Sequence, residues 1–388
     1  MKRKITAVII NRANYARVKT VLLALNEAAD AELSIVAGSS SVLERFGSVS
    51  NRMSQDGLPE ARVLHTAVEG STPIAMAKTT GLSVIELSSE FERTEPDVVV
   101  TVADRFETLG TAIASSYMNI PLAHTQGGEV SGSIDEKVRH SITKLADLHF
   151  PATERAQDFL IRMGEPREKV FLTGCPSIDL AAQGDLTLSA DFFGRAGGVG
   201  ATVDTQQPYI VVSQHPVTTS FADASAQIRE TLLACMRMRD EGFQIVWLWP
   251  NIDAGSDRIT KTLRSFRETE DSRAFHFYKN FGPEDYLKLI YNSACLIGNS
   301  SSGIRESAFL GIPAVNIGGR QALRERGPNV VDVDYNSEAI ESACRSQVSH
   351  GNYASSQLFG DGTAGEQIAK ILRTVELSHT KSLNYLDS

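Results

Sequence analysis

Several ionisable side chains lie close together in the stretch HTQGGEVSGSIDEKVRH, residues 124–140. They follow a histidine and two glycines, and include Glu129, Asp135, Glu136, Arg139 and His140. A carboxylate in such a set can act as a general base, and a cationic group can support an anionic leaving group. The stretch is therefore a candidate site for proton transfer.

A purely structural interpretation of this stretch is also open. Ser133 with Glu136 three residues later fits a capping box at the start of an amphipathic helix, which predicts a structural role for Glu136. Asp135 and Arg139 stand four residues apart, so they share a helix face and could form an ion pair worth a few tenths of a kcal/mol. Because they follow a Gly-Gly turn at the end of a predicted strand, a catalytic role for Asp135 stays open beside the structural one.

A second candidate lies in TVADRFETLG, residues 101–110, where Asp104 and Arg105 end an apolar strand and begin a helix. Asp104 could be the N-cap of that helix, a contribution of about 1 kcal/mol. It could also project into a ligand site from the carboxyl end of the strand. The sequence favours the cap slightly, and a carboxylate can serve both purposes.

Two further stretches suit an anionic ligand. GNSSSGIRE, residues 298–306, offers serine hydroxyls and backbone N–H groups between a strand and a helix, which is typical of a phosphate site, and Glu306 is placed to reach a ribose diol. His215 in SQHPVTTS is held at a turn by the proline that follows it. Arg12 and Lys19, which follow the first predicted strand, give a weaker signal for anion binding.

Composition narrows the class of protein. The chain has 388 residues, of which 42% are hydrophobic and 22% charged, the profile of a globular protein with substantial cores. A net charge of −9 and a pI of about 5.5 argue against broad nucleic-acid or membrane-surface binding. Four scattered cysteines without CxxC spacing predict buried free thiols and no metal site. The N-terminal apolar run is too short for a signal peptide, so we expect a cytoplasmic protein.

The elements that must position these groups alternate regularly. Short apolar runs are separated by amphipathic stretches, one of them a helix predicted over residues 15–29, and this pattern is typical of parallel sheets covered on both faces. The alternation breaks in residues 181–207, which we interpret as a linker, and then resumes. The sequence therefore predicts an α/β protein of two Rossmann-like domains, residues 1–180 and 205–364, with a cleft between them. A last helix in residues 365–388 could pack on either domain.

Taken together, these stretches resemble the hydrolysing UDP-N-acetylglucosamine 2-epimerases, which include bacterial enzymes of sialic- and legionaminic-acid-type sugar synthesis. The resemblance runs in order over nearly the whole chain, through NRANY, ADRFE, QGGEVSGSIDEKVRHSITKL, GCPSID, QHPVTT, PNIDAGSD, GNSSSGIRE and FGDGTA. It implies a GT-B fold. It also implies a reaction in which UDP leaves C1 with loss of the C2 proton, after which water adds to the 2-acetamidoglucal and a free manno sugar is released.

The resemblance implies roles for individual residues as well. The catalytic residues around the reacting sugar would be Asp104, Gln126, Glu129, Asp135, Arg139 and His215. The residues that bind the UDP-sugar would be Arg12, Lys19, Arg105, Asn251, Ser300, Ser301, Glu306 and Arg320. No metal or other cofactor is implied, and homodimers and homotetramers are common in the family. The lack of a GxGxxG motif after the first strand argues against a dinucleotide-dependent dehydrogenase.

The chain departs from the family pattern most clearly at Gln126, where many relatives have a catalytic glutamate. An amide cannot act as a base, and a positioned base contributes about 10²–10⁴ in rate. Glu129 could take over this role, or the chemistry could depend on Asp104 and Asp135. A third alternative is a different substrate, UDP-2,4-diacetamido-2,4,6-trideoxyglucose in place of UDP-N-acetylglucosamine.

Two smaller departures are Ala103, where a glycine is frequent, and Asn14, where an aspartate is common. Three other functions stay open on the sequence alone. A GT-B glycosyltransferase would share the serine-rich loop but would not need paired aspartates. A non-hydrolysing epimerase would return a UDP-linked product, and a silent nucleotide-sugar binder would bind UDP without turnover.

Overall fold

The computed structural model describes residues 2–42, 49–70, 72–132, 134–200, 202–250, 253–270, 272–378, 380–382 and 384. The chain divides into two compact units. The first comprises residues 1–130, 134–182 and 359–388, and the second comprises residues 131–133 and 183–358. Each unit contains a six-stranded sheet whose strand pairs are all parallel.

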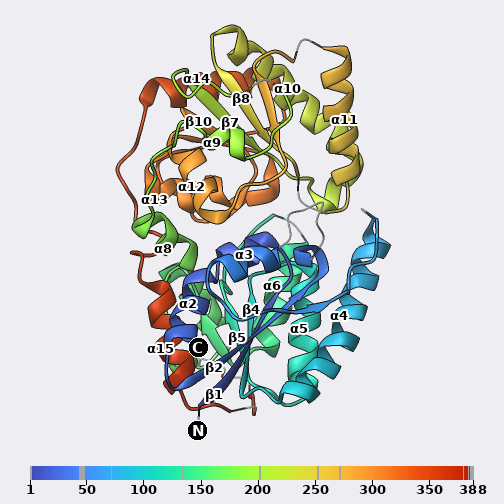
Figure 1. Ribbon diagram of the computed structural model, residues 1–388, viewed down its shortest axis with the longest axis vertical. Coiled ribbons are helices and arrows are strands. Elements are labelled where there is room, and N and C mark those ends of the chain that lie inside the picture. Colours follow the sequence, from blue (N-terminus) through green and yellow to red (C-terminus); the bar gives the residue numbers. More distant parts are fainter. Residues whose placement is uncertain are drawn as a thin grey trace. The chain divides into compact units, whose positions relative to one another are not determined.

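The first unit has helices on both faces of its sheet (Figure 1). Its strands lie in the order β3 (Arg62–Leu64), β2 (Ala31–Gly38), β1 (Arg3–Ile9), β4 (Val98–Val102), β5 (Leu122–Thr125) and β6 (Leu148–Phe150). Its helices are α1 (Arg12–Ala16), α2 (Lys19–Glu27), α3 (Val49–Gln55), α4 (Pro73–Thr94), α5 (Phe106–Tyr117), α6 (Asp135–Leu145), α7 (Glu154–Arg162), α8 (Pro176–Gln183) and α15 (Ala364–Thr374). Helices α2 and α15 pack together on one face, and α4, α5 and α6 cover the other.

The second unit repeats this architecture. Its strands lie in the order β12 (Val330–Val333), β11 (Ala314–Ile317), β10 (Cys295–Gly298), β7 (Tyr209–Ser213), β8 (Gln244–Leu248) and β9 (Phe275–Tyr278). Its α-helices are α9 (Phe192–Arg195), α10 (Ala224–Asp240), α11 (Ser256–Thr269), α12 (Pro283–Tyr291), α13 (Glu306–Leu310) and α14 (Ser337–His350). A short 3₁₀ turn, η5 (Ser301–Gly303), follows β10.

Both sheets have the strand order 3-2-1-4-5-6 when the strands are numbered within each unit. The chain therefore changes direction beside the first strand of each sheet, between β1 and β4 in the first unit and between β7 and β10 in the second. Ligands of open parallel sheets bind outside the carboxyl ends of the strands at such a switch point. The loops that follow these four strands are thus the places where functional side chains are expected.

The apolar runs predicted as strands are strands, and their burial explains why they are continuously hydrophobic. All five residues of β4 and all five of β7 are buried, as expected for strands covered on both faces. The short edge strands β3 and β12 had no clear signal, because three or four partly exposed residues carry little periodicity.

Two predicted segments differ from the structure. The helix expected over residues 15–29 is broken into α1 and α2, and the break brings Val18 into the core. The linker expected over residues 181–207 is partly packed on the second unit. The Phe192 ring stacks on Phe281 with 5.5 Å between centroids, and Phe193 meets the edge of Tyr209 at 5.6 Å. These two adjacent aromatic residues pack the segment onto the second unit, although the residues around them are rich in Gly and Ala.

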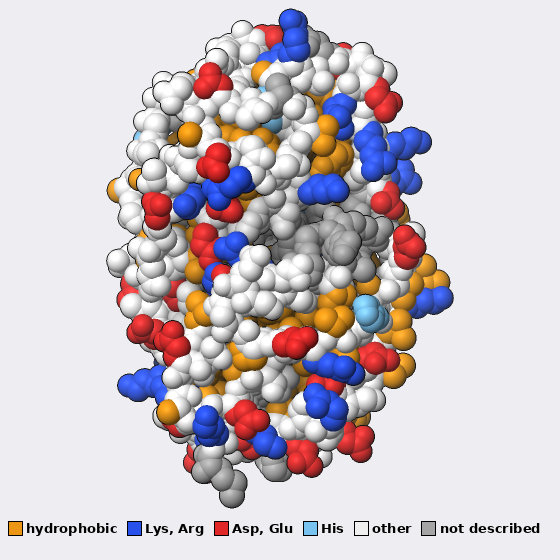
Figure 2. Space-filling model, viewed as in Figure 1, with side chains coloured by type: hydrophobic (Ala, Val, Ile, Leu, Met, Phe, Trp, Pro, Cys, Tyr) orange, Lys and Arg blue, Asp and Glu red, His pale blue; other side chains and the backbone are white. Residues whose placement is uncertain are grey.

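Four features of the described residues bear on binding to membranes, charged partners and metal ions. None of their helices has the length and apolar character needed to span a bilayer. Figure 2 shows acidic and basic side chains interspersed over the face that it draws, in keeping with the net charge of −9. All four cysteines are buried free thiols, as predicted. Within the described part of the chain, no cluster of His, Cys, Asp and Glu is arranged to hold a metal ion.

The C-terminal helix α15 belongs to the first unit and is anchored there by Asp179 of α8. The buried Asp179 carboxylate accepts hydrogen bonds from the N–H groups of Ala364 and Gly365, at 3.0 and 2.6 Å, and from the Thr20 hydroxyl at 2.8 Å. A side-chain acceptor at a helix start satisfies N–H groups that have no partner inside the helix. Asp179 thus joins three distant segments of the unit.

We predict that Asp179→Ala lowers the free energy of unfolding of the first unit by about 3 kcal/mol, because it leaves two buried N–H groups and a hydroxyl without their acceptor. Denaturant unfolding followed by circular dichroism measures the change. Asp361→Ala is the control, since Asp361 is exposed and bonds only to Thr363 among the contacts of the described residues. Equal losses for the two variants would contradict this role of Asp179.

Candidate functional site

The loop after β4 is held in a conformation that aims Asp104 away from the strand. Ala103 has a φ of +61°, in the left-handed region that favours glycine. Its N–H donates to the Thr125 carbonyl at 3.1 Å, and its carbonyl accepts from Nε2 of the His124 ring at 2.8 Å. Burial lowers the pKa of His124 to about 3, so the ring is neutral and can keep this donor role near neutral pH. Hydrogen bonds between Ala103 and two residues of the neighbouring strand β5 therefore fix the turn before Asp104.

Arg139 of α6 lies at the centre of a charged cluster in the first unit. Its side chain is fully buried, yet its guanidinium donates from Nε and Nη2 to Oδ2 of Asp104, with Nε at 3.1 Å. Nη1 donates to the Glu129 carbonyl at 2.8 Å and to Oε2 of Glu136 at 2.7 Å. Glu136 in turn bonds to Nε2 of His140 at 2.8 Å. The cluster joins the loops after β4 and β5 to the first turn of α6.

The electrostatics of this cluster keep Arg139 charged. Burial lowers the pKa of its guanidinium, but the charges of Asp104, Glu129 and Glu136 outweigh burial and raise the pKa above its ordinary value. Three carboxylates thus surround one buried cation. The side chain of Asp104 is 12% exposed and that of Glu136 is 27% exposed, so the carboxylates lie toward the surface while the cation lies behind them. A ligand at this edge of the sheet would meet carboxylates first.

Gln126, which directly follows β5, has a side chain held by other groups than those around Arg139. Its side chain is buried, and Nε2 donates to Sγ of Cys175 at 3.1 Å, which in turn lies 3.1 Å from the Ser177 hydroxyl. Its backbone has a φ of +61° and its N–H donates to the Phe150 carbonyl at 2.8 Å. The amide is therefore buried, and the side chains that the structure places next to it, Cys175 and Ser177, are uncharged.

Of the two structural roles predicted for this region, the N-cap role of Asp104 is wrong and the capping box of Glu136 is not tested. Helix α5 begins at Phe106 with Arg105 as its N-cap residue, so Asp104 precedes the cap and bonds to Arg139 instead. Helix α6 begins at Asp135, with Ile134 as an N-cap residue that makes no side-chain cap bond. The Glu136 carboxylate accepts from Nη1 of Arg139 and bonds to Nε2 of His140, while its capping box with Ser133 stays a prediction. Ser133, the predicted cap, lies outside the described residues.

The remaining residues predicted for the first unit have other contacts. Lys19 is buried and pairs with Asp56 at 2.7 Å. Arg105 pairs with the buried Glu107 at 3.3 Å. Helix α1 contains Arg12, whose side chain is outside the described part of the structure. Their roles in substrate binding stay predictions.

The second unit brings His215 and the serine-rich loop together at its own switch point. The side-chain amide of Asn299 accepts from the His215 N–H at 2.7 Å and donates to the His215 carbonyl at 2.9 Å. The Ser213 carbonyl accepts from the N–H groups of Asn299 and Ser300, at 3.1 and 3.2 Å. Gly298, with a φ of +130°, makes this approach possible, because a Cβ there would lie 2.2 Å from the Ser213 oxygen. The loops after β7 and β10 form one fixed surface.

Polar groups from three segments surround this surface. The Asn299 carbonyl accepts from Nη1 of Arg320 at 3.1 Å and from Nε2 of Gln321 at 2.9 Å. The Ser300 hydroxyl lies 2.9 Å from that of Ser302. Glu306 is buried, and its Oε2 atom has no hydrogen-bond partner among the described residues. An acceptor in this position can receive a hydrogen bond from a ligand hydroxyl.

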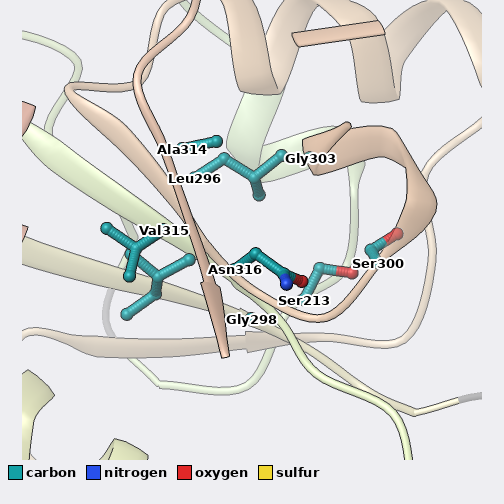
Figure 3. Close-up of a pocket in the computed structure, with 9 residues that line it drawn as sticks. Ser213, Leu296, Gly298, Ser300, Gly303, Ala314, Val315 and Asn316 are labelled. Atoms are coloured by element: carbon teal, nitrogen blue, oxygen red, sulfur yellow. The ribbon is translucent and has the colours of Figure 1, made fainter. Parts of the chain in front are cut away.

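A small hollow opens at the same place. It is lined by Ser213, Leu296, Ile297, Gly298, Ser300, Gly303, Ala314, Val315 and Asn316. Figure 3 shows the polar ends of Ser213 and Asn316 side by side, with Ser300 in the turn next to them. The hollow therefore has an apolar floor and a rim of hydroxyl and amide groups.

Sequence reasoning missed several residues that shape these two surfaces. Asn299 and Gln321 lie in or next to sequence stretches that predicted a ligand site, but the sequence did not indicate which backbone groups their side-chain amides would bind. His140 was noticed as titratable, and its partner Glu136 was interpreted as a cap. Asn251 was predicted to bind UDP and lies outside the described residues. Ser301 is partly exposed in η5, next to Ser300.

Comparison with known proteins gives a consistent result. A protein-family model described as UDP-N-acetylglucosamine 2-epimerase matches residues 23–373. The chain is 34% identical to a hydrolysing UDP-N,N'-diacetylbacillosamine 2-epimerase of Legionella pneumophila, over 99% of each chain. It is 26% identical to a UDP-N-acetylglucosamine 2-epimerase of Neisseria meningitidis, over 96% of each chain. The crystal structure of a UDP-GlcNAc 2-epimerase of Methanocaldococcus jannaschii matches with a TM-score of 0.78 at 18% identity, over 95% of this chain and 99% of that chain. The fold is therefore of the GT-B type, as predicted.

We predict that Gln126→Glu lowers the free energy of unfolding by about 2 kcal/mol at pH 8 and by much less at pH 5. Burial among uncharged groups raises the pKa of a carboxyl in the folded state above its unfolded value, so the loss appears as pH rises above that value. Denaturant unfolding at both pH values measures it. Gln206→Glu, at an exposed position, should change stability by less than about 0.5 kcal/mol. A loss independent of pH would contradict the prediction.

Proposed function

The chain belongs to the UDP-N-acetylglucosamine 2-epimerase family, and from this premise we propose that it is a hydrolysing 2-epimerase. It would convert a UDP-linked 2-acetamido sugar of gluco configuration to UDP and the free manno sugar. The observation that carries this proposal is the buried Arg139 guanidinium held by Asp104 and Glu136, with Glu129 beside them. The hydrolysing activity named for the Legionella pneumophila relative supports it.

In the proposed reaction, a side chain of the first unit removes the proton at C2 of the sugar. A carboxylate of this unit, Asp104 or Asp135, removes the proton at C2 while the bond between C1 and the diphosphate oxygen breaks. The electron pair of the C2–H bond forms the C1–C2 double bond of the 2-acetamidoglucal, and UDP leaves with the electrons of the C1–O bond. Water then adds to C1 and a proton returns to C2 from the opposite face. Arg139 orients the Asp104 carboxylate throughout.

The second unit supplies the groups that would hold the nucleotide. Hydroxyls of Ser300 and Ser301 suit the diphosphate, Arg320 supplies positive charge, and the Glu306 carboxylate suits a ribose diol. His215 is partly exposed and its backbone is fixed on both sides by Asn299, which suits a residue that contacts the leaving group. Support for the leaving diphosphate contributes most when its donors are held in place before the reaction.

Two sugars are candidates for the substrate. UDP-N-acetylglucosamine is the sugar named for the family. UDP-2,4-diacetamido-2,4,6-trideoxyglucose is supported by the name of the Legionella pneumophila relative and by Gln126 in place of a frequent glutamate. A glycosyltransferase is less well supported, because its reaction gives no reason for a carboxylate cluster around a buried arginine.

We predict that proton NMR in D₂O shows a free manno sugar with deuterium at C2, together with UDP, from at least one of these two substrates. In water enriched in ¹⁸O the label should enter the C1 hydroxyl and not UDP, because the C1–O bond is the one that breaks. A UDP-linked manno product would make the protein a non-hydrolysing epimerase. If both substrates stay intact while UDP binds, the epimerase proposal fails.

We also predict that Asp104→Asn lowers kcat at least about a hundredfold and that Asp135→Asn lowers it at least about tenfold, the latter without loss of folding. The amides keep the size of the side chains but cannot accept the C2 proton. The coupled release of UDP measures kcat, and circular dichroism reports folding. Asp158→Asn is the control, since that side chain is 61% exposed on α7. Turnover near that of the wild type would remove the residue concerned from the mechanism.

A further inference from the structure

Tyr286 of α12 reaches the serine-rich loop of the second unit, although nothing in the sequence singled it out. Its ring is partly exposed, but its hydroxyl forms a hydrogen bond with the Ser302 hydroxyl. The Ser302 hydroxyl in turn lies next to that of Ser300, and Ser300 lines the hollow shown in Figure 3. The phenol is thus linked through Ser302 to the Ser300 hydroxyl in the loop after β10.

These hydroxyls form a chain whose direction can be argued from the number of protons. The Ser302 hydroxyl lies 2.9 Å from that of Ser300, and Ser300 Oγ also accepts the Ser302 N–H at 3.4 Å. Each hydroxyl has a single proton to donate. If Tyr286 donates to Ser302, then Ser302 donates to Ser300, and the proton of Ser300 is directed out of the chain toward the rim of the hollow.

The phenol keeps its proton under all ordinary conditions. Burial of the hydroxyl raises the pKa of Tyr286 to about 12, the nearby negative charge of Glu306 adds to this rise, and the serine hydrogen bonds oppose it. At ordinary pH the Tyr286 hydroxyl therefore keeps a proton that it can donate at the inner end of the chain.

We propose that Tyr286 is a positioning residue of the nucleotide site, whose phenol orients the Ser302 and Ser300 hydroxyls so that Ser300 donates to the diphosphate of the bound nucleotide. This inference rests on the proposed function in so far as it takes the ligand to be a nucleoside diphosphate. A hydroxyl whose proton is already aimed at a phosphate oxygen binds more tightly than one that must first reorient. Tyr286 contributes without touching the ligand.

The test is the affinity of Tyr286→Phe for UDP and for uridine, measured by calorimetry on the full chain. We expect the Kd for UDP to rise about tenfold, as for the loss of one hydrogen bond to a charged group, and the Kd for uridine to change by less than about twofold. In a Ser302→Ala background the same substitution should weaken UDP by less than about twofold, because the link to Ser300 is already broken.

Tyr209→Phe is the matched control. The buried Tyr209 hydroxyl donates to the Leu289 carbonyl of the same helix α12 at 2.7 Å. Its loss should lower stability but leave the affinity for UDP within about twofold of the wild type. Unchanged UDP affinity in Tyr286→Phe, or equal weakening of UDP and uridine, would overturn the inference. UDP binding without turnover of either sugar substrate would overturn the epimerase proposal alone, and a wild-type protein that binds no UDP would overturn both.

Discussion

The buried charge of Arg139 is the constraint on which the candidate active site depends. A guanidinium removed from water is stable only where its N–H groups meet acceptors and its charge meets carboxylates. The loop after β4 supplies Asp104, the loop after β5 supplies the Glu129 carbonyl, and the first turn of α6 supplies Glu136. Three segments separated in the sequence are therefore held to one another by a single side chain. Their carboxylates are placed before any ligand arrives, which is the condition for efficient proton transfer.

The two units share one structural feature at their switch points but differ in the side chains around it. At each switch point an asparagine amide uses both its oxygen and its nitrogen to hold neighbouring backbone. Asn14 accepts from the Ile10 N–H and donates to the Val102 carbonyl at 3.2 Å, and Asn299 holds His215. An aspartate at position 14 could not donate while ionised, which gives a physical reason for the amide. Charged side chains lie around this shared feature in the first unit, and hydroxyl groups lie around it in the second. This difference is in keeping with the proposed proton transfer in the first unit and the proposed nucleotide binding in the second.

Local pattern was enough to predict the fold and most of the polar segments, but not the contacts of individual side chains. Continuous apolar runs such as β4 and β7 can only be strands covered on both faces, so the parallel sheets followed from them. The role of Glu136 did not follow, because a capping box and a partner for a buried arginine need the same residue at the same place. The contact with the arginine also involves Asp104, which is 32 residues away in the sequence and binds the same guanidinium. The contacts of Asn299 and Tyr286 could not be predicted for the same reason, since their partners come from other loops.

Gln126 shows how the surroundings of a position limit the chemistry available to it. Its side chain is turned toward Cys175 and Ser177, where a neutral amide can donate to sulfur and where a carboxylate would be buried among uncharged groups. Asp104, which contacts Arg139 instead, receives two N–H bonds on its Oδ2 atom, which fixes the orientation of the carboxylate relative to the guanidinium. The proposed proton transfer therefore relies on a carboxylate that a buried charge orients, and not on the side chain at position 126.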